Sequence, residues 1–567
     1  MATQEGSWPL PVQDEKHSAE TVSITSMESS ESTQVVGTTN LFENGQMRLI
    51  PMPSPDPKDP LNMPNWRKWT SISVICFFGA LALSAEIIIG ALLPVFILEY
   101  AGLDPKSLND LDLSSDGGAA TVNPLSILPP GFPPPDIEKI TTLATIPLIS
   151  NGVASYLLVP LSIAIGRRPI ILLAGTCAWA GGIWAGLSTS LGTHLVARAI
   201  QGLGAGAVEA LIPLIIQDMT FIHQRNRAMS AIVASQGIFI VGFGIASPYI
   251  ASNFTWRWLY FITSGFGILA WILLIVFLPE TRWTRSPEAL SGHKIYPMEA
   301  SKNRPDIDFQ NYTSRTFVQE MGFGQNGYEW KNAGKSMVDT LKSTYFPAIV
   351  WAILANSIFI VANQAAAQLT SFALLAAGWQ FQYTGLSVVP FIAASVMVYI
   401  FGGPVADKVS NSISRRNGGN REAEHHLVNL IFPFFCGIAG CFIFGYAGEK
   451  VLHWAVLLVG AFLVIFGFLT LMTVLNVFIV ESYPQWAGPV LVNVSSLRII
   501  IAFFMASQAT VWVTDMGMLS TFSIYAEIMI VLSLGVPAFY FFGKKMRAWT
   551  AGSINKTRKE KSLNFDD

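Results

Sequence analysis

The feature that most constrains this 567-residue chain is a series of apolar stretches that starts near Thr70 and continues almost to the C-terminus. Each stretch holds about 20 residues, enough to cross a hydrocarbon core of about 30 Å as a helix. A backbone in lipid must satisfy its own hydrogen bonds, and barrel strands would be short and alternating, so these stretches are helices. We predict twelve spans, at residues 70–98, 140–164, 169–188, 195–217, 228–250, 257–279, 345–371, 383–405, 427–447, 453–480, 489–513 and 519–542.

Composition narrows the class of protein further. Charged residues make up 13% of the chain, whereas soluble domains carry roughly 25%. A net charge of −2 gives no sign of a nucleic-acid surface. The four cysteines form no zinc or disulfide pattern, and no Gly-x-x-x-x-Gly-Lys-Ser/Thr loop for ATP is present. None of the seven histidines lies in the middle of an apolar run, which counts against a membrane enzyme. We therefore expect no cofactor, no metal and no enzymatic activity.

A polar stretch between the sixth and seventh predicted spans divides the chain into two halves. Six helices followed by six helices are typical of a two-lobed transporter whose site lies between the lobes. We predict an all-α polytopic membrane protein, a monomer, with 12 transmembrane helices in two six-helix lobes. Its segments are a disordered cytosolic tail (1–65), an N-terminal lobe (66–280) with an extracellular loop (99–139), a cytosolic central loop (281–344), a C-terminal lobe (345–543) and a cytosolic tail (544–567).

Lysine and arginine predict the orientation of these spans. The short loops on one side carry thirteen of these residues, and those on the other side carry four. Cytosolic loops are the ones enriched in Lys and Arg, so both termini are expected in the cytosol. No retention signal is visible at residues 564–567, which favours the plasma membrane first and the vacuolar membrane second.

Two basic segments lie at corresponding places in the halves and form a weak internal repeat. The positive-inside rule alone explains the arginine pairs equally well. The glycines and the aspartate favour a packed cytosolic gate in which helix ends approach closely. The residues of this predicted gate are Gly166, Arg167, Arg168, Gly403, Asp407, Lys408, Arg415 and Arg416.

Charged residues inside the first-half spans are candidates for proton coupling or substrate binding, because a charge at the bilayer centre is costly. Glu86 lies about sixteen residues into the first helix. Arg198 and Glu209 lie on the fourth helix, eleven residues and roughly 16 Å apart on one face. A carboxyl group sheltered from water can exchange protons near neutral pH, as coupling requires. We favour Glu209 for this role; the alternative is a structural contact with a neighbouring helix.

The second half supplies one charged candidate and several polar ones. Arg498 could bind an anionic group or an acid, and we expect it to pair with a helix end near Glu481. Four amides are candidates for lining a cavity, and hydrogen bonding between helices is an equal alternative. These amides are Gln236, Asn363, Gln364 and Asn476.

Several segments, taken together and in order, resemble the major facilitator superfamily, and more narrowly the fungal 12-helix drug:proton antiporters. They are 59–69, which resembles the lead-in to the first helix, 166–169, 198–206, 237–248, 279–281 and 481–498. The resemblance covers nearly all of residues 55–545. The sequence departs from the family at Ile163 and Ala164, where the loop motif usually has an aspartate and an arginine, and at Ser247, where the antiporter motif has glycine.

The resemblance implies a function. It implies a proton-coupled antiporter for multidrug efflux, which exports small amphiphilic or cationic compounds by alternating access, with Arg198 taking part in proton movement. The partners expected are a small-molecule substrate, protons and the lipid bilayer. Two alternatives stay open: a proton-coupled importer of a small organic cation such as a polyamine, and a membrane sensor that has kept the scaffold without transport.

Overall fold

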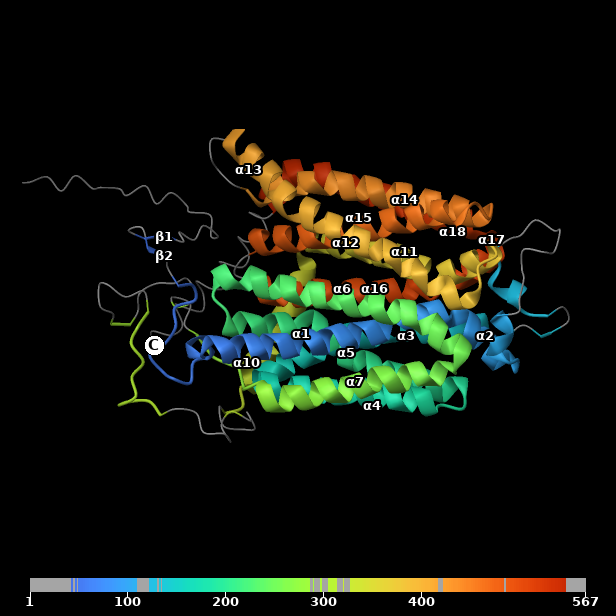
Figure 1. Ribbon diagram of the computed structural model, residues 1–567. Coiled ribbons are helices and arrows are strands. Elements are labelled where there is room, and N and C mark those ends of the chain that lie inside the picture. Colours follow the sequence, from blue (N-terminus) through green and yellow to red (C-terminus); the bar gives the residue numbers. More distant parts are fainter. Residues whose placement is uncertain are drawn as a thin grey trace, which may run out of the picture. The chain divides into compact units, whose positions relative to one another are not determined.

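The structure is a computed structural model. It describes residues 49–109, 122–129, 135–285, 304–313, 327–416, 422–483 and 486–546, and the shorter pieces 42–43, 46–47, 132–133, 289, 296–297 and 320. Long helices that lie side by side dominate these residues (Figure 1). A small antiparallel pair, β1 (Phe42–Glu43) with β2 (Gln46–Met47), precedes them.

The first half of the chain supplies six long helical segments and several short turns. Its elements are η1 (Pro60–Asn62), α1 (Asn65–Ile87), η2 (Ile88–Leu92), α2 (Leu93–Ala101), η3 (Pro105–Asn109), η4 (Pro124–Ile127), α3 (Ile137–Ala164), α4 (Arg167–Leu187), α5 (Leu191–Met219), α6 (Ile222–Asn253) and α7 (Trp256–Phe277). The helices α1, η2 and α2 together form the first span.

The second half begins with a short helix and again supplies six long segments. Its elements are α10 (Trp330–Lys342), η5 (Ser343–Tyr345), α11 (Pro347–Ala376), η6 (Phe381–Val388), α12 (Val389–Ile400), the π-helical turn η7 (Phe401–Val405), α13 (Ala406–Arg416), η8 (Ala423–Leu430), α14 (Ile431–Glu449), α15 (Trp454–Ser482), α16 (Ala487–Ala506), α17 (Ala509–Met516) and α18 (Met518–Ser533). The last span continues as helix to Met546.

The predicted all-α polytopic fold is confirmed. Within the described residues, eleven helical segments are long and apolar enough to cross a membrane. The twelfth predicted span, 228–250, lies in α6, which has 32 residues and is therefore about 48 Å long. Every predicted span is thus helical, and α6 packs along α1 in the same bundle.

The first span is interrupted close to a candidate residue. After Ile87 the α-helix gives way to the 3₁₀ turn η2, and α2 then starts with Pro94 in its first turn. Proline has no N–H to donate, so the regular ladder of hydrogen bonds is broken here. The carbonyl groups released by this interruption become acceptors for a side chain of another helix, described below.

The sequence predicts a disordered tail over residues 1–65, but the residues just before α1 are ordered in the structure. The stretch 50–62 is packed, with Asp59 at its centre. The Asp59 carboxylate accepts hydrogen bonds from the backbone N–H groups of Ser54 (2.8 Å) and Leu61 (2.9 Å) and forms a buried ion pair with Arg285 (2.6 Å). A polar, proline-rich stretch is typical of disordered segments. The stretch 50–62 is ordered because Asp59 forms an ion pair with Arg285, far along the chain.

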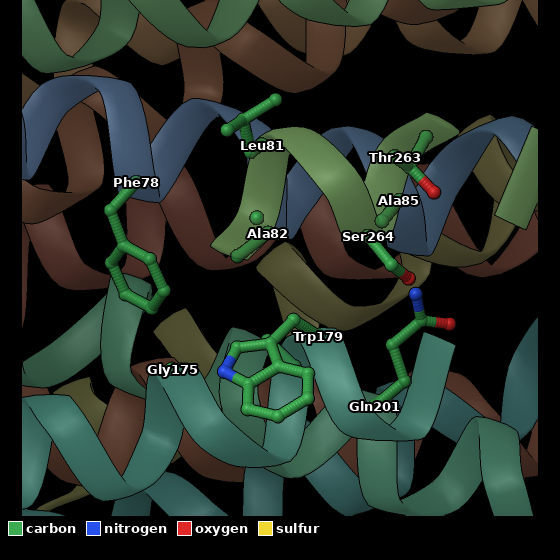
Figure 2. Close-up of a pocket in the computed structure, with 11 residues that line it drawn as sticks. Phe78, Leu81, Ala82, Ala85, Gly175, Trp179, Gln201, Thr263 and Ser264 are labelled. Carbon is green, nitrogen blue, oxygen red and sulfur yellow. The ribbon is translucent and has the colours of Figure 1, made fainter. Parts of the chain in front are cut away.

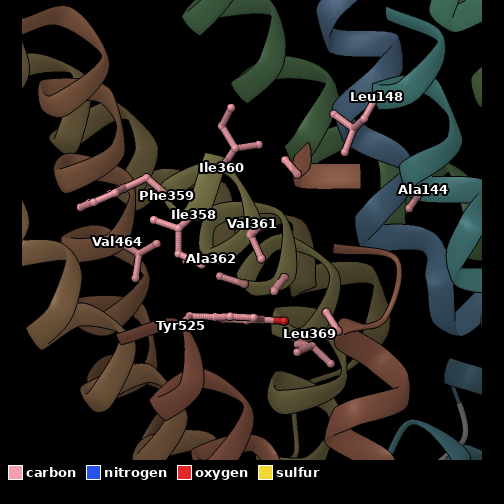
Figure 3. Close-up of a cluster of buried hydrophobic side chains, with 14 of the residues drawn as sticks. Ala144, Leu148, Ile358, Phe359, Ile360, Val361, Ala362, Leu369, Val464 and Tyr525 are labelled. Carbon is pink, nitrogen blue, oxygen red and sulfur yellow. The ribbon is translucent and has the colours of Figure 1, made fainter. Parts of the chain in front are cut away.

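The core of the second half is built around α11, which is buried on almost every side. Figure 3 shows Phe359, Val361 and Leu369 of this helix, with Val464 of α15 and Tyr525 of α18 around them. A helix that is apolar all round occupies the interior of a bundle. The same apolar cluster includes residues of α3, so α11 packs at the junction of the two halves.

Candidate functional site

Glu86 is a buried acid at the interruption of the first span. Only 4% of the residue is exposed. Its Oε2 accepts a hydrogen bond of 3.2 Å from Nδ2 of Asn151 on α3. Among the ion pairs of the described residues, none includes Glu86. Burying a lone carboxylate is costly, so this site is suited to a bound proton or to a cation that arrives from outside.

Arg198 lies beside Glu86 but binds uncharged acceptors. Its guanidinium donates to the carbonyl oxygens of Leu143 (3.2 Å), Ala85 (2.9 Å) and Glu86 (3.0 Å). A fourth bond, of 2.5 Å, goes to Oε1 of Gln201. Arg198 is fully buried, so it holds α1, α3 and α5 together at the carbonyl groups that the interruption releases.

Glu209 and Arg498 form an ion pair between the two halves of the chain. Arg498 Nη2 of α16 lies 2.5 Å from Glu209 Oε2 of α5. Arg498 is buried, and its Nε and Nη1 have no hydrogen-bond partner within the part of the chain that the structure describes. The expected partner of Arg498 near Glu481 is wrong: Glu481 instead lies 3.1 Å from Nε2 of His426. An arginine with two unused donors could also receive an anionic group.

A second link between the halves was missed by the sequence analysis. Tyr156 of α3 donates a hydrogen bond to Oδ1 of Asn493 on α16. Nδ2 of Asn493 donates to the hydroxyl oxygens of Ser343 (2.7 Å) and Thr344 (3.0 Å) just before α11. The one signal in the sequence is an asparagine inside an apolar run, and the structure buries it fully.

The four amide candidates lie on three helices. Gln364 is buried on α11, whereas Asn363 of α11, Gln236 of α6 and Asn476 of α15 are half-buried. Within the described residues, no hydrogen bond joins any of them to Glu86 or Glu209. Gln368 of α11 is a stronger polar candidate, because its buried Nε2 has no hydrogen-bond partner among the residues that the structure describes.

The first-half residues that were predicted to form a gate lie at the start of α4, close to two acids from elsewhere in the chain. The carboxylate of Glu280 accepts hydrogen bonds from the backbone N–H groups of Arg167 (3.0 Å) and Arg168 (3.2 Å). Nε of Arg167 lies 3.1 Å from Oδ2 of Asp218 at the end of α5. Asp218 thus joins the end of α5 to the start of α4.

Gly166 is required at this turn. Its φ of +138° is one that other residues rarely adopt. A Cβ atom built on it would lie 2.5 Å from Oε2 of Glu280. The glycine therefore lets the carboxylate approach the start of α4.

The second half has a related contact between its own helix ends. His426, just before α14, pairs with Glu481 at the end of α15, as Arg167 at the start of α4 pairs with Asp218 at the end of α5. Of the predicted gate residues in this half, Lys408 and Arg416 are exposed on α13. Gly403 lies in the turn η7, and the side chains of Asp407 and Arg415 are outside the described part of the structure.

A small cavity lies within the first half, beside the Arg198 network. Figure 2 shows Phe78 of α1, Trp179 of α4, Gln201 of α5 and Ser264 of α7 around it. Its volume of ≈ 20 Å³ is enough for about one water molecule. Gln201 both lines this cavity and accepts from Arg198, so a water here would extend the buried polar network.

The fold and these intramembrane polar groups are those of a multi-pass membrane transporter. The sequence profile of the Major Facilitator Superfamily matches residues 75–504. The chain belongs to this superfamily, as the motifs indicated, and is a transporter of that family and not an enzyme.

Comparison with known proteins gives relatives of low identity. An uncharacterised MFS-type transporter of Schizosaccharomyces pombe is 22% identical over 90% of this chain and 90% of its own length. The efflux pump radE of Floropilus chiversii is 24% identical over 87% of this chain and 83% of its own.

A solved structure supports the fold alone. The xylose transporter XylE from E. coli, in a partially occluded inward-open conformation, superposes with a TM-score of 0.53 at 12% identity. The match covers 83% of this chain and 98% of XylE.

Proposed function

We propose that this chain is a proton-coupled antiporter that exports small amphiphilic or cationic organic compounds by alternating access. The observation that carries the proposal is Glu86, a buried acid whose carboxyl group has one hydrogen-bond partner among the described residues, the neutral amide of Asn151. Such a group holds either a proton or the positive charge of a substrate. Competition between the two for one carboxylate couples their movements in opposite directions.

The ion pair between Glu209 and Arg498 serves as a lock in this proposal. It joins α5 of the first half to α16 of the second. The halves can rock apart only when this ion pair opens. The free-energy cost of opening the pair is lower when Glu209 is protonated, or when an anionic group binds the donors of Arg498 that have no partner among the described residues. Glu209, which the sequence analysis favoured as the coupling acid, thus becomes the partner of the lock, and Glu86 takes the coupling role.

Arg198 has a positioning role in this scheme. It binds the carbonyl oxygens of Ala85 and Glu86, and so fixes the backbone that carries the coupling acid. The family resemblance implies that Arg198 takes part in proton movement. In this scheme the proton binds to the Glu86 side chain, which lies beside Arg198.

Export is favoured over import by the relatives. Efflux pumps such as radE are similar over most of their length. An importer of a small organic cation would use the same acid, and a sensor would keep the fold without moving solute. The lobes are proposed as 66–280 and 345–543, joined by a cytosolic loop at 281–344 and flanked by cytosolic tails, in the plasma membrane.

A cellular accumulation assay tests this proposal. Cells that overexpress the chain and cells that lack it are loaded with a fluorescent amphiphilic cation. Lower accumulation on overexpression, abolished by collapsing the pH gradient, is the expected result. Higher accumulation identifies an importer, and equal accumulation over a broad set of compounds identifies a sensor; either contradicts the proposal.

A further inference from the structure

The helix α10 (Trp330–Lys342) lies outside the transport machinery described above. It directly precedes α11 through the turn η5. At its start, the backbone N–H of Glu329 donates to the carbonyl oxygen of Ala164, the last residue of α3 (3.1 Å). The helix therefore lies at the level where the spans α3 and α11 reach the edge of the membrane.

Three faces can be distinguished on α10 at 100° per residue. The first face packs on the protein and includes Ala333 and Thr340, which are 5% and 3% exposed. The second is apolar and open: it comprises Trp330, Met337, Val338 and Leu341, exposed by 57%, 39%, 48% and 52%. The third is basic and consists of the exposed residues Lys331, Lys335 and Lys342.

The order of these faces around the helix matters. The apolar face lies between the face that packs on the protein and the row of lysines. Asp339, the one acid of this helix, lies with Asn332 beyond the lysines, on the side away from the apolar face. Tyr345, immediately after the helix, is 83% exposed. An apolar face with a bordering row of lysines and aromatic residues near its ends is typical of helices that lie in the headgroup region of a bilayer.

We propose that α10 lies in the membrane–water interface and binds the headgroups of anionic phospholipids. Its apolar face enters the acyl boundary, and the lysine stems extend along it so that the ammonium groups reach lipid phosphates and carboxylates. Charge complementarity decides the occupant: an apolar protein surface would leave the lysines without a role, and a soluble polyanion would leave the apolar face in water. The binding does not depend on the proposed transport function.

The depth of α10 can be measured by spin labelling of the full chain in vesicles of phosphatidylcholine with 30% phosphatidylserine. A Cys177→Ala background is suitable, because the other three cysteines are buried. The test position is Val338→Cys. The matched references are Asn332→Cys, on the polar face of the same helix, and Ile272→Cys, an exposed position on the membrane helix α7.

The label at Val338 is expected to collide with oxygen more than with a water-soluble nickel chelate, as the label at Ile272 does. The label at Asn332 is expected to show the opposite preference. If the label at Val338 is as accessible to the nickel chelate as the label at Asn332, the helix faces water and the proposal is overturned.

The preference for anionic lipid is tested by measuring phosphatidylserine binding to purified protein by native mass spectrometry. The double variant Lys331→Gln/Lys335→Gln is compared with Lys106→Gln/Lys450→Gln, which removes two exposed lysines from other loops. Each α10 lysine is expected to contribute a factor of about 5 in affinity. Equal phosphatidylserine binding by the two double variants overturns the proposal, even if both still transport.

Discussion

Arg498 and Glu209 are 289 residues apart in the sequence, yet Nη2 of one lies 2.5 Å from Oε2 of the other. The contact joins the two halves of the bundle through α16 and α5. Arg498 is almost fully buried, and two of its donors have no partner among the described residues. In the proposed mechanism, opening this pair accompanies the relative movement of the two halves.

The first prediction concerns this pair. Arg498→Gln and Glu209→Gln are each expected to lower the free energy of unfolding in mixed micelles, by about 1–3 kcal/mol, since each leaves a charge without its partner. The double variant is expected to lose less than the sum, with a coupling of about 0.5–3 kcal/mol.

The control for this cycle is the pair of Arg257 and Glu99, which is considerably more exposed. Its coupling is expected to be below about 1 kcal/mol, because water screens exposed pairs. Additive losses for Arg498 and Glu209 would show that the contact does not hold the halves together.

The second prediction concerns the turn before α4. Gly166→Ala forces a side chain into a positive-φ position and against Glu280, and is expected to cost about 1–3 kcal/mol. Gly192→Ala is the matched control, because this glycine lies in α5 with open space around it and alanine favours a helix. Equal melting temperatures for the two variants would argue against a tight contact between Glu280 and the α3–α4 turn.

The third prediction concerns the folded lead-in at 50–62. Asp59→Asn removes the buried ion pair with Arg285, and loss of one partner of such a pair costs about 3–5 kcal/mol. The lead-in is expected to detach and to be cleaved at least tenfold faster in limited proteolysis. Asp56→Asn, which changes only a local bond to the N–H of Lys58, is expected to leave the cleavage rate unchanged; cleavage at the same rate in both variants would mean that Asp59 does not hold the lead-in.

The sequence was sufficient for the helices and for much of the candidate site. Runs of apolar residues predicted every span, because a lipid-exposed backbone leaves few alternatives to a helix. Glu86, Arg198 and Arg498 stood out as charges inside such runs, and each is buried in the structure.

The partners of these residues could not be predicted. The period of a helix says which residues share a face, but not which face of another helix it meets. The pairing of Arg498 with Glu209 depends on how α16 crosses α5, and that of Asp218 with Arg167 on the turn between α3 and α4. The lead-in was misread for a related reason: Asp59 is ordered by Arg285, 226 residues further on.

The fourth prediction concerns the proposed coupling acid. Glu86→Gln keeps the shape of the side chain and removes its ability to carry a proton or a charge. The variant is expected to bind and exchange substrate but to lose at least tenfold in transport driven by a pH gradient. Glu527→Gln, at an exposed acid on α18, is expected to transport as the unaltered chain does.

The most direct test uses purified protein in proteoliposomes with an imposed pH gradient and a rhodamine dye as the amphiphilic cation. The unaltered chain is expected to move dye and protons in opposite directions, and Glu86→Gln to exchange dye without moving protons. Proton-coupled dye movement by Glu86→Gln at the rate of the unaltered chain would contradict the account.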